Sequence, residues 1–133
     1  MKKLHRALER DLDELLAAIR SGGAVAESLR QARGGIQKHY RAEEIFLEKL
    51  GMYDPRLATK ISAQHAEVLE IAAGAEEAIS AGQASDMVSL ARRFQALAQH
   101  NIIEEERDVF PLADRCFTSA EQQKLERALS ENA

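Results

Sequence analysis

The chain contains four histidines, and each lies on or at the edge of the apolar face of its own predicted helix: His5, His39, His65 and His100. Two glutamates, Glu43 and Glu104, also fall on apolar faces when residues are placed at about 100° per residue. A carboxylate in an apolar core carries a large desolvation cost unless it is neutralised or coordinated. One histidine on such a face is usually a hydrogen-bonded core residue, but histidines and carboxylates together indicate a buried metal centre.

The spacing of these residues supports a metal centre. Four positions separate His39 from Glu43, and four separate His100 from Glu104, so each pair shares one helix face. Each pair can therefore bind the same ion or two adjacent ions. Imidazole and carboxylate ligands suit iron, with manganese and zinc as alternatives. Glu9 follows His5 at the same spacing but lies at the edge of the apolar face, so we interpret it as a surface partner.

Short breaks divide the chain into four long helices and a shorter last one, predicted at residues 2–20, 24–50, 55–81, 86–115 and 119–130. Residues that commonly end or begin helices mark the first three breaks, at 21–23, 51–55 and 82–86. Pro111 is expected to end or kink the fourth helix. Thr118 and Glu121 have the spacing of a capping box, which would open the last helix.

Long helices joined by short loops predict an all-α fold. We expect an up-down-up-down antiparallel four-helix bundle over residues 2–115, followed by a short C-terminal fifth helix. Residues 1–133 would form a single domain, because the chain is too short for two comfortable cores.

The histidines are spaced so that they would lie at one height in such a bundle. Two residues equidistant from a connecting loop lie at the same level. The midpoint between His5 and His39 is position 22, and that between His39 and His65 is position 52. The midpoint between His65 and His100 is at 82–83. All three positions fall in predicted loops, so we expect the four histidines to face one another in one layer.

Composition limits the class of protein. The 133 residues are 45% hydrophobic and 30% charged, which suits a folded domain with a solvated surface. A formal net charge of −4 argues against nucleic-acid binding, and no apolar run approaches the roughly 18 residues of a membrane span. The single cysteine, Cys116, excludes an internal disulfide and a multi-cysteine metal cage. Since no signal-peptide pattern is present, we expect a cytoplasmic protein.

Two segments carry a family resemblance. Residues 39–44 (HYRAEE) and 100–111 (HNIIEEERDVFP), together with His5 and His65, resemble the hemerythrin-like (HHE) cation-binding domain. The resemblance implies a four-helix bundle with a non-haem di-iron centre of two iron ions, held by histidines and two bridging carboxylates. Carried over by position, the implied metal ligands are His5, His39, Glu43, His65, His100 and Glu104.

Other residues are expected beside these ligands. Glu105 is an alternative ligand in place of Glu104, and Tyr40 and Asn101 are candidates for contacts around the centre. The oxygen-carrying hemerythrins have a second histidine four residues after the one on the third helix, where this chain has Leu69. This departure argues against reversible oxygen transport and leaves a coordination position for water, a carboxylate or a small molecule.

The resemblance favours a metal- and gas-binding protein over a dedicated enzyme, although the sequence does not decide between them. The expected ligand is oxygen, nitric oxide, peroxide or a small anion, and any sensing output would need a redox or signalling partner protein. Two alternatives stay open. One is an iron-handling enzyme of oxidative or nitrosative stress, such as a peroxidase or repair protein, and the other is a metal-stabilised structural bundle.

Overall fold

The computed structural model describes the chain from residue 2 to residue 131, and its side chains from residue 5 to residue 130. Every element in this part of the chain is helical, which confirms the all-helical prediction. The elements are α1 (Lys2–Ser21), α2 (Val25–Tyr53), α3 (Pro55–Ser80), α4 (Ala84–Glu104), the π-helical segment η1 (Glu105–Val109), α5 (Phe110–Cys116) and α6 (Ser119–Glu131). None of the described helices is long and apolar enough to cross a membrane.

Local signals in the sequence account for the breaks between helices. Gly22 and Gly82 have φ angles of 71° and 70°, a conformation that glycine adopts without the steric penalty of a Cβ atom. Asp54 caps α3 by accepting a 3.0 Å hydrogen bond from a backbone N–H of the first turn. Before α6, the N–H of Thr118 donates to the Glu121 carboxylate, and the N–H of Glu121 donates to the Thr118 hydroxyl. These reciprocal bonds form the predicted capping box.

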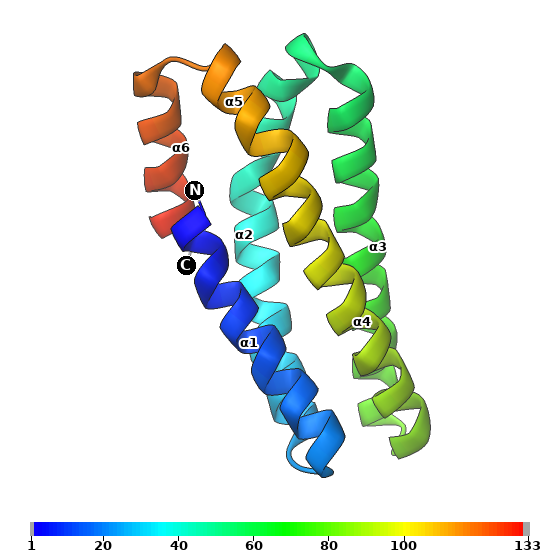
Figure 1. The fold of residues 1–133 in the computed structure, drawn as a ribbon. Coiled ribbons are helices and arrows are strands. Elements are labelled where there is room, and N and C mark those ends of the chain that lie inside the picture. Colours follow the sequence, from blue (N-terminus) through cyan, green and yellow to red (C-terminus); the bar gives the residue numbers. More distant parts are fainter. Residues whose placement is uncertain (1, 132–133) are drawn as a thin grey trace.

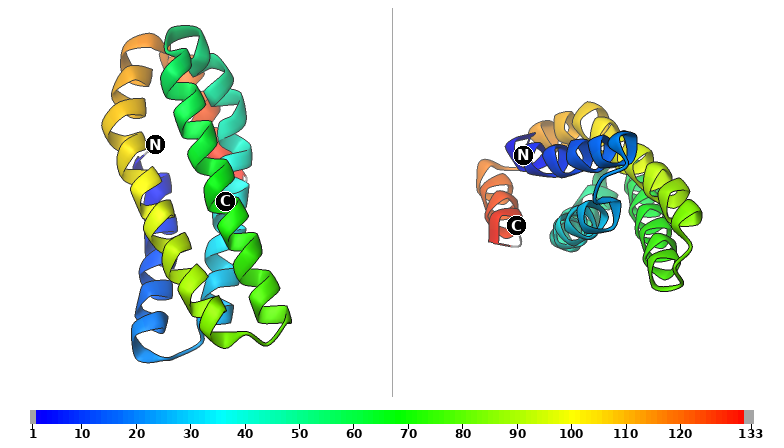
Figure 2. Two further views of the ribbon diagram at one scale, coloured as in Figure 1. Left: turned by 90° about the vertical axis from the view of Figure 1, so that its right-hand side faces the viewer. Right: turned by 90° about the horizontal axis from the view of Figure 1, so that it is seen from below.

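The helices α1, α2, α3 and α4 lie side by side as a bundle (Figure 1). The α1–α2 and α3–α4 loops lie at one end of it, and the α2–α3 loop lies at the other. Beyond α5 the chain turns and returns as α6, which packs on α2 at the outside of the bundle (Figure 2). All four bundle helices can therefore contribute side chains to a shared interior.

The fourth predicted helix, 86–115, is interrupted by η1. The N–H of Phe110 donates to the carbonyl of Glu105, five residues earlier, so this turn holds one residue more than an α-helical turn. Pro111 follows at once; it has no N–H to donate, and its ring would crowd the carbonyl of the residue four positions before it. The wider turn accommodates both constraints, so the change expected at Pro111 takes the form of a π-helical turn.

Buried apolar side chains form two separate clusters along the bundle. The larger joins α1, α2, α3 and α4 and includes Leu12, Leu15, Leu29, Ile36, Val68 and Phe94. The smaller joins the other half of α2 and the start of α3 to the C-terminal segments, and includes Phe46, Leu50, Ile61, Val109, Phe117 and Leu129. The change from one cluster to the other falls between residues 40 and 42 on α2 and between residues 61 and 68 on α3. On the fourth side of the bundle it falls between residues 102 and 109, in α4 and η1. Polar side chains fill this boundary.

Candidate metal centre

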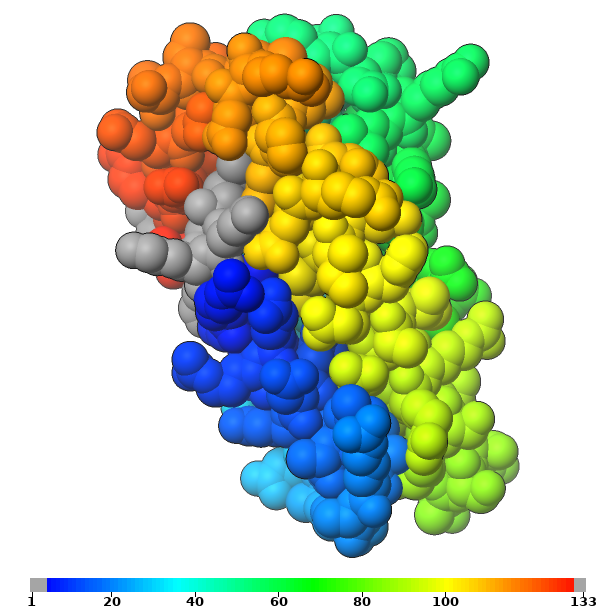
Figure 3. Space-filling model, in the orientation of Figure 1, coloured from blue at the N-terminus to red at the C-terminus, as the bar shows by residue number. Residues whose placement is uncertain are grey.

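Three histidines and two glutamates form a buried cluster between the two apolar clusters. His5 comes from α1, His39 and Glu43 from α2, His65 from α3 and Glu105 from the first position of η1. Each of the five is no more than 7% exposed, and His5 and Glu105 are only 1% exposed. The side chains of α1 and α4 meet on the face that Figure 3 shows, in keeping with this burial. Four separate elements therefore deliver titratable side chains to one buried place.

In each carboxylate of the cluster, one oxygen faces the pair His5 and His39 and the other oxygen faces His65. Glu43 Oε1 contacts His39 Nε2, while Glu43 Oε2 is 3.9 Å from His65 Nε2. Glu105 Oε1 is 3.3 Å from His5 Nε2, while Glu105 Oε2 is 2.9 Å from His65 Nε2. The rings of His5 and His39 are neighbours, with centroids 5.1 Å apart. Glu43 and Glu105 thus lie between the pair His5 and His39 on one side and His65 on the other.

Several polar atoms of the cluster lack hydrogen bonds. Glu43 Oε1, Glu105 Oε1 and His39 Nε2 are buried and have no hydrogen-bond partner of acceptable geometry. Burying such atoms unpaired is costly, so native proteins rarely leave them unpaired. Ligand atoms of His5, His39, Glu43 and Glu105 all lie within 4.8 Å of one another. Nitrogen and oxygen atoms that converge without satisfying one another fit a bound cation.

The charges in the cluster are strongly coupled. Burial, together with repulsion from His5, lowers the pKa of His39 to about 4, so its imidazole is neutral and able to ligate at neutral pH. Burial also raises the pKa of Glu43 well above its usual value, with a further contribution from the nearby charge of Glu105. Burial alone would raise the pKa of Glu105 as well, but the close imidazoles of His5 and His65 outweigh it and hold that pKa far below its usual range. In the metal-free protein these shifts favour the protonated form of Glu43 and the ionised form of Glu105.

The structure does not bring His100 and Glu104 into this cluster. The side chain of His100 is 58% exposed, and its Nε2 lies 3.0 Å from Glu104 Oε1. Glu104 also faces Lys60 Nζ at 3.2 Å and accepts a hydrogen bond from Gln64. The expectation of a single layer of four histidines therefore needs correction, because three of them share the layer and the fourth faces solvent.

The reason lies in the face that α4 turns to the core. Large apolar residues such as Leu90 and Leu97 suggest one face, but both are only half-buried. Ala91, Ala98 and Asn101, which lie one residue further on, are fully buried together with Phe94, and the same face continues to Glu105. One residue turns a helix by about 100°. Alanines at the centre of the buried face thus rotate His100 and Glu104 away from the cluster and Glu105 into it.

The remaining predicted neighbours lie around the cluster. Tyr40 stacks on His65 with ring centroids 3.6 Å apart and an interplanar angle of 8°. Its hydroxyl donates a 3.1 Å hydrogen bond to Asn101 Oδ1, and Asn101 is 1% exposed. Leu69 is half-buried and packs against the larger apolar cluster. Gln64 was not among the predicted residues, and its partners Asn101 and Glu104 lie on another helix.

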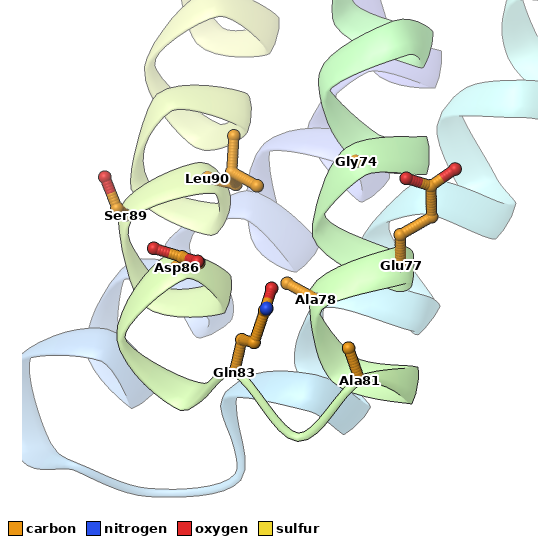
Figure 4. Close-up of a pocket in the computed structure, with 8 residues that line it drawn as sticks. All are labelled: Gly74, Glu77, Ala78, Ala81, Gln83, Asp86, Ser89 and Leu90. Carbon is orange, nitrogen blue, oxygen red and sulfur yellow. The ribbon is translucent and has the colours of Figure 1, made fainter.

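The chain also has surface hollows away from these residues. One lies between the ends of α3 and α4, beside their connecting loop, and is lined by Glu77, Gln83, Asp86, Ser89 and their neighbours (Figure 4). None of its lining residues belongs to the buried cluster. The hollow is open to solvent, whereas the residues of the candidate metal centre are buried and converge on one another. The metal centre is therefore the stronger candidate for the functional site.

A helical bundle that buries histidines and carboxylates at its middle defines a class of metal-binding proteins. The family model of the hemerythrin HHE cation binding domain matches residues 1–113, and the chain therefore belongs to this family. No curated protein and no solved structure gives a significant match. The family match covers all five residues of the cluster.

Proposed function

We propose that this protein holds a non-haem di-iron centre at the buried cluster and that it binds or responds to small molecules such as oxygen, peroxide or nitric oxide. The observation that carries the proposal is that each of the two carboxylates has one oxygen on either side, facing different histidines. Oxygens of Glu43 and Glu105 face His5 and His39 on one side, and the other oxygens face His65. Carboxylates placed in this way can bridge two metal ions, as bundle proteins with di-iron sites do.

The two proposed metal positions have different ligand sets. The first has two imidazoles, His5 and His39, and one oxygen from each bridging carboxylate. The second has one imidazole, His65, and the other two carboxylate oxygens. Iron suits this mixture of nitrogen and oxygen ligands, with manganese and zinc as alternatives. Metal binding would favour the ionised form of Glu43 over the protonated form that burial favours, because a bridging carboxylate must be ionised.

The second position is the proposed site for small molecules. Leu69 cannot ligate a metal, and its side chain packs against the larger apolar cluster. His100 would have to leave Glu104 to become a ligand, so its predicted ligand role remains a proposal. A metal with few protein ligands has positions open for water or an exogenous molecule. When bound, an iron pair with such open positions would supply electrons to oxygen or peroxide and would bind nitric oxide or azide.

An enzyme of oxidative or nitrosative stress is the second candidate, since it would use the same open position. Turnover with peroxide or nitric oxide would separate it from a binding protein. A purely structural metal site is disfavoured by the small number of ligands at the second position, because structural sites generally have a complete set of protein ligands. The proposed location in the cytoplasm and any redox or signalling partner also await experiment.

Metal analysis of protein purified without added metal, combined with an absorption spectrum, tests the proposal. We expect two iron ions per chain and a ferric spectrum that changes when azide is added. After reduction, stopped-flow mixing with oxygen should give rapid oxidation without a long-lived oxygenated form. A coloured oxygen adduct that persists for many minutes and is reversed by removing oxygen would support a carrier instead. A folded protein that binds no metal in any preparation would contradict the proposal.

A further inference from the structure

A string of hydrogen-bonded side chains connects the buried cluster to Glu104, a buried residue whose carboxylate contacts the exposed side chains of Lys60 and His100. The hydroxyl of Tyr40 is 3.1 Å from Asn101 Oδ1, and Asn101 Nδ2 is 2.9 Å from Gln64 Oε1. Gln64 Nε2 in turn donates to Glu104 Oε2. Helices α2, α3 and α4 contribute the four side chains. The string begins beside His65 and ends at a carboxylate surrounded by exposed cations.

The chemistry of its last member fixes the direction of the whole string. An ionised carboxylate can only accept hydrogen bonds, so Gln64 must turn its NH₂ group to Glu104. The Gln64 oxygen then faces Asn101, which must present its own NH₂ group. The Asn101 oxygen is left facing Tyr40, whose hydroxyl must donate. Each member therefore has one consistent orientation, and Glu104 sets all of them.

The surroundings of Glu104 keep its carboxylate ionised. Its Oε2 accepts the hydrogen bond from Gln64 Nε2, and an ammonium group lies on the same oxygen. Lys60 Nζ is 3.2 Å from Glu104 Oε2, and His100 Nε2 is 3.0 Å from Glu104 Oε1. These contacts also explain why Glu104, although adjacent in sequence to Glu105, lies outside the buried cluster.

The other end of the string positions a member of the cluster. The Tyr40 ring lies flat on the His65 ring at 3.6 Å, and both rings are buried. A tyrosine held at its hydroxyl cannot slide or tilt freely, so the imidazole beneath it is held in plane as well. In that plane His65 Nε2 points to Glu105 Oε2 at 2.9 Å.

We propose that Glu104 is a positioning residue: as the acceptor end of the string, it orients Gln64, Asn101 and Tyr40 and so fixes His65, the only imidazole of the second metal position. The consequence for metal binding rests on the proposed di-metal centre, whereas the string itself exists without metal. Residues that orient metal ligands in this way typically affect metal affinity by roughly 10–100-fold.

A pair of variants tests the direction of the string. Glu104→Gln keeps the size of the side chain but allows it to donate or accept, so the direction is no longer fixed. Combining Glu104→Gln with Gln64→Glu moves the carboxylate one place inward. The carboxylate at position 64 then accepts from Asn101 and from the new amide at position 104, so Asn101 and Tyr40 keep their orientation. Glu67→Gln, at an exposed position on α3, is the matched control.

Two readouts separate this proposal from the proposed function. The chain has two tyrosines and no tryptophan, so in a Tyr53→Phe background Raman bands sensitive to tyrosine hydrogen bonding report Tyr40 alone. We expect Glu104→Gln to change these bands in the metal-free protein, and the double variant to restore them. In the metal-loaded protein, chelator competition should show the second metal bound roughly 10–100-fold more weakly in Glu104→Gln. The double variant should return to within a few-fold of the parent.

The outcomes are distinct. Unchanged Tyr40 bands in Glu104→Gln, with helicity and melting temperature equal to those of the parent, would overturn the proposal whether or not the protein binds metal. Failure of the double variant to restore the second metal would also overturn it, because a direct ligand role for Glu104 would not be rescued from position 64. A protein that binds no metal but shows the Raman changes would contradict the di-iron centre and leave the string supported.

Discussion

Glu104 and Glu105 are neighbours in the chain and both are buried, yet their carboxylates contact different kinds of group. Glu105 is 1% exposed and contacts His5 and His65. Glu104 faces Gln64, Lys60 and the exposed His100. Both carboxyls have lowered pKa values, but buried histidines lower that of Glu105 against the effect of burial, whereas an amide and a surface lysine lower that of Glu104.

The difference shows that residue type and spacing alone do not assign a ligand. Both glutamates follow His100 closely, and both could approach a metal in principle. One residue of helical rotation sends them to different faces, and η1 begins at the buried one. The Glu104 carboxylate contacts an amide and a lysine, whereas the Glu105 carboxylate contacts buried imidazoles, where we propose that it bridges two metals.

The largest expected effect separates the two glutamates directly. Glu105→Ala removes an oxygen from each proposed metal position, so we expect it to lose both metals. Glu104→Ala should retain two metals per chain at saturating iron, since it supplies no ligand atom. Elemental analysis of both variants, alongside circular dichroism to confirm folding, makes the comparison. Equal losses in the two variants would contradict the assignment.

The histidines offer a second comparison. His65→Ala should lose the second metal and keep the first, because His5 and His39 lie on the other side of the bridging carboxylates. His100→Ala should keep both metals if the imidazole stays on Glu104, as it does in this structure. Competition with a chelator, followed by metal analysis, gives the occupancies. Loss of the second metal in His100→Ala would show instead that His100 turns inward to ligate.

A smaller effect is expected in the acid stability of the metal-free protein. The pKa of His39 is lowered to about 4 in the folded state, against about 6.5 when unfolded. Between these pH values His39 is protonated in the unfolded chain but not in the folded chain. The contribution of His39 to the free energy of unfolding therefore falls as the pH falls. The slope is about 1.4 kcal/mol per pH unit, or roughly 3 kcal/mol over the window.

Replacing His39 by Asn removes that contribution. Denaturant unfolding at several pH values between 7 and 4 should therefore give a flatter profile for His39→Asn than for the parent protein. Parallel profiles would show that His39 titrates normally in the folded state. Glu43, whose pKa is raised, contributes with the opposite sign and contacts His39, so the difference between the two profiles reports the loss of His39 together with any change that this causes at Glu43.

The fold was largely predictable from local signals. Asp54 and the Thr118–Glu121 pair cap helices by bonds within four residues, and such bonds depend little on the rest of the molecule. Glycines at 22 and 82 relieve the strain of positive φ where the predicted loops lie. The continuous fourth helix was predicted less well, because a π-helical turn depends on how Pro111 is accommodated.

The site was predictable only in part. The loop midpoints correctly bring His5, His39 and His65 together, because helix length and loop position fix the height of a residue. They do not fix the direction in which its side chain points. On α4 that direction is set by buried alanines and Asn101, which carry weaker pattern signals than the half-buried leucines. Gln64 had no signal at all, since its role exists only through contacts across helices.

Anomalous X-ray diffraction from crystals of the iron-loaded protein tests the central claim most directly, because it locates the metals without reference to spectra or activity. We expect two iron peaks. One should lie beside His5, His39, Glu43 and Glu105, and the other beside His65 and the same two carboxylates. Peaks at His100 and Glu104 with none at the buried cluster would contradict it. So would a folded protein whose buried cluster shows no anomalous peak under saturating iron.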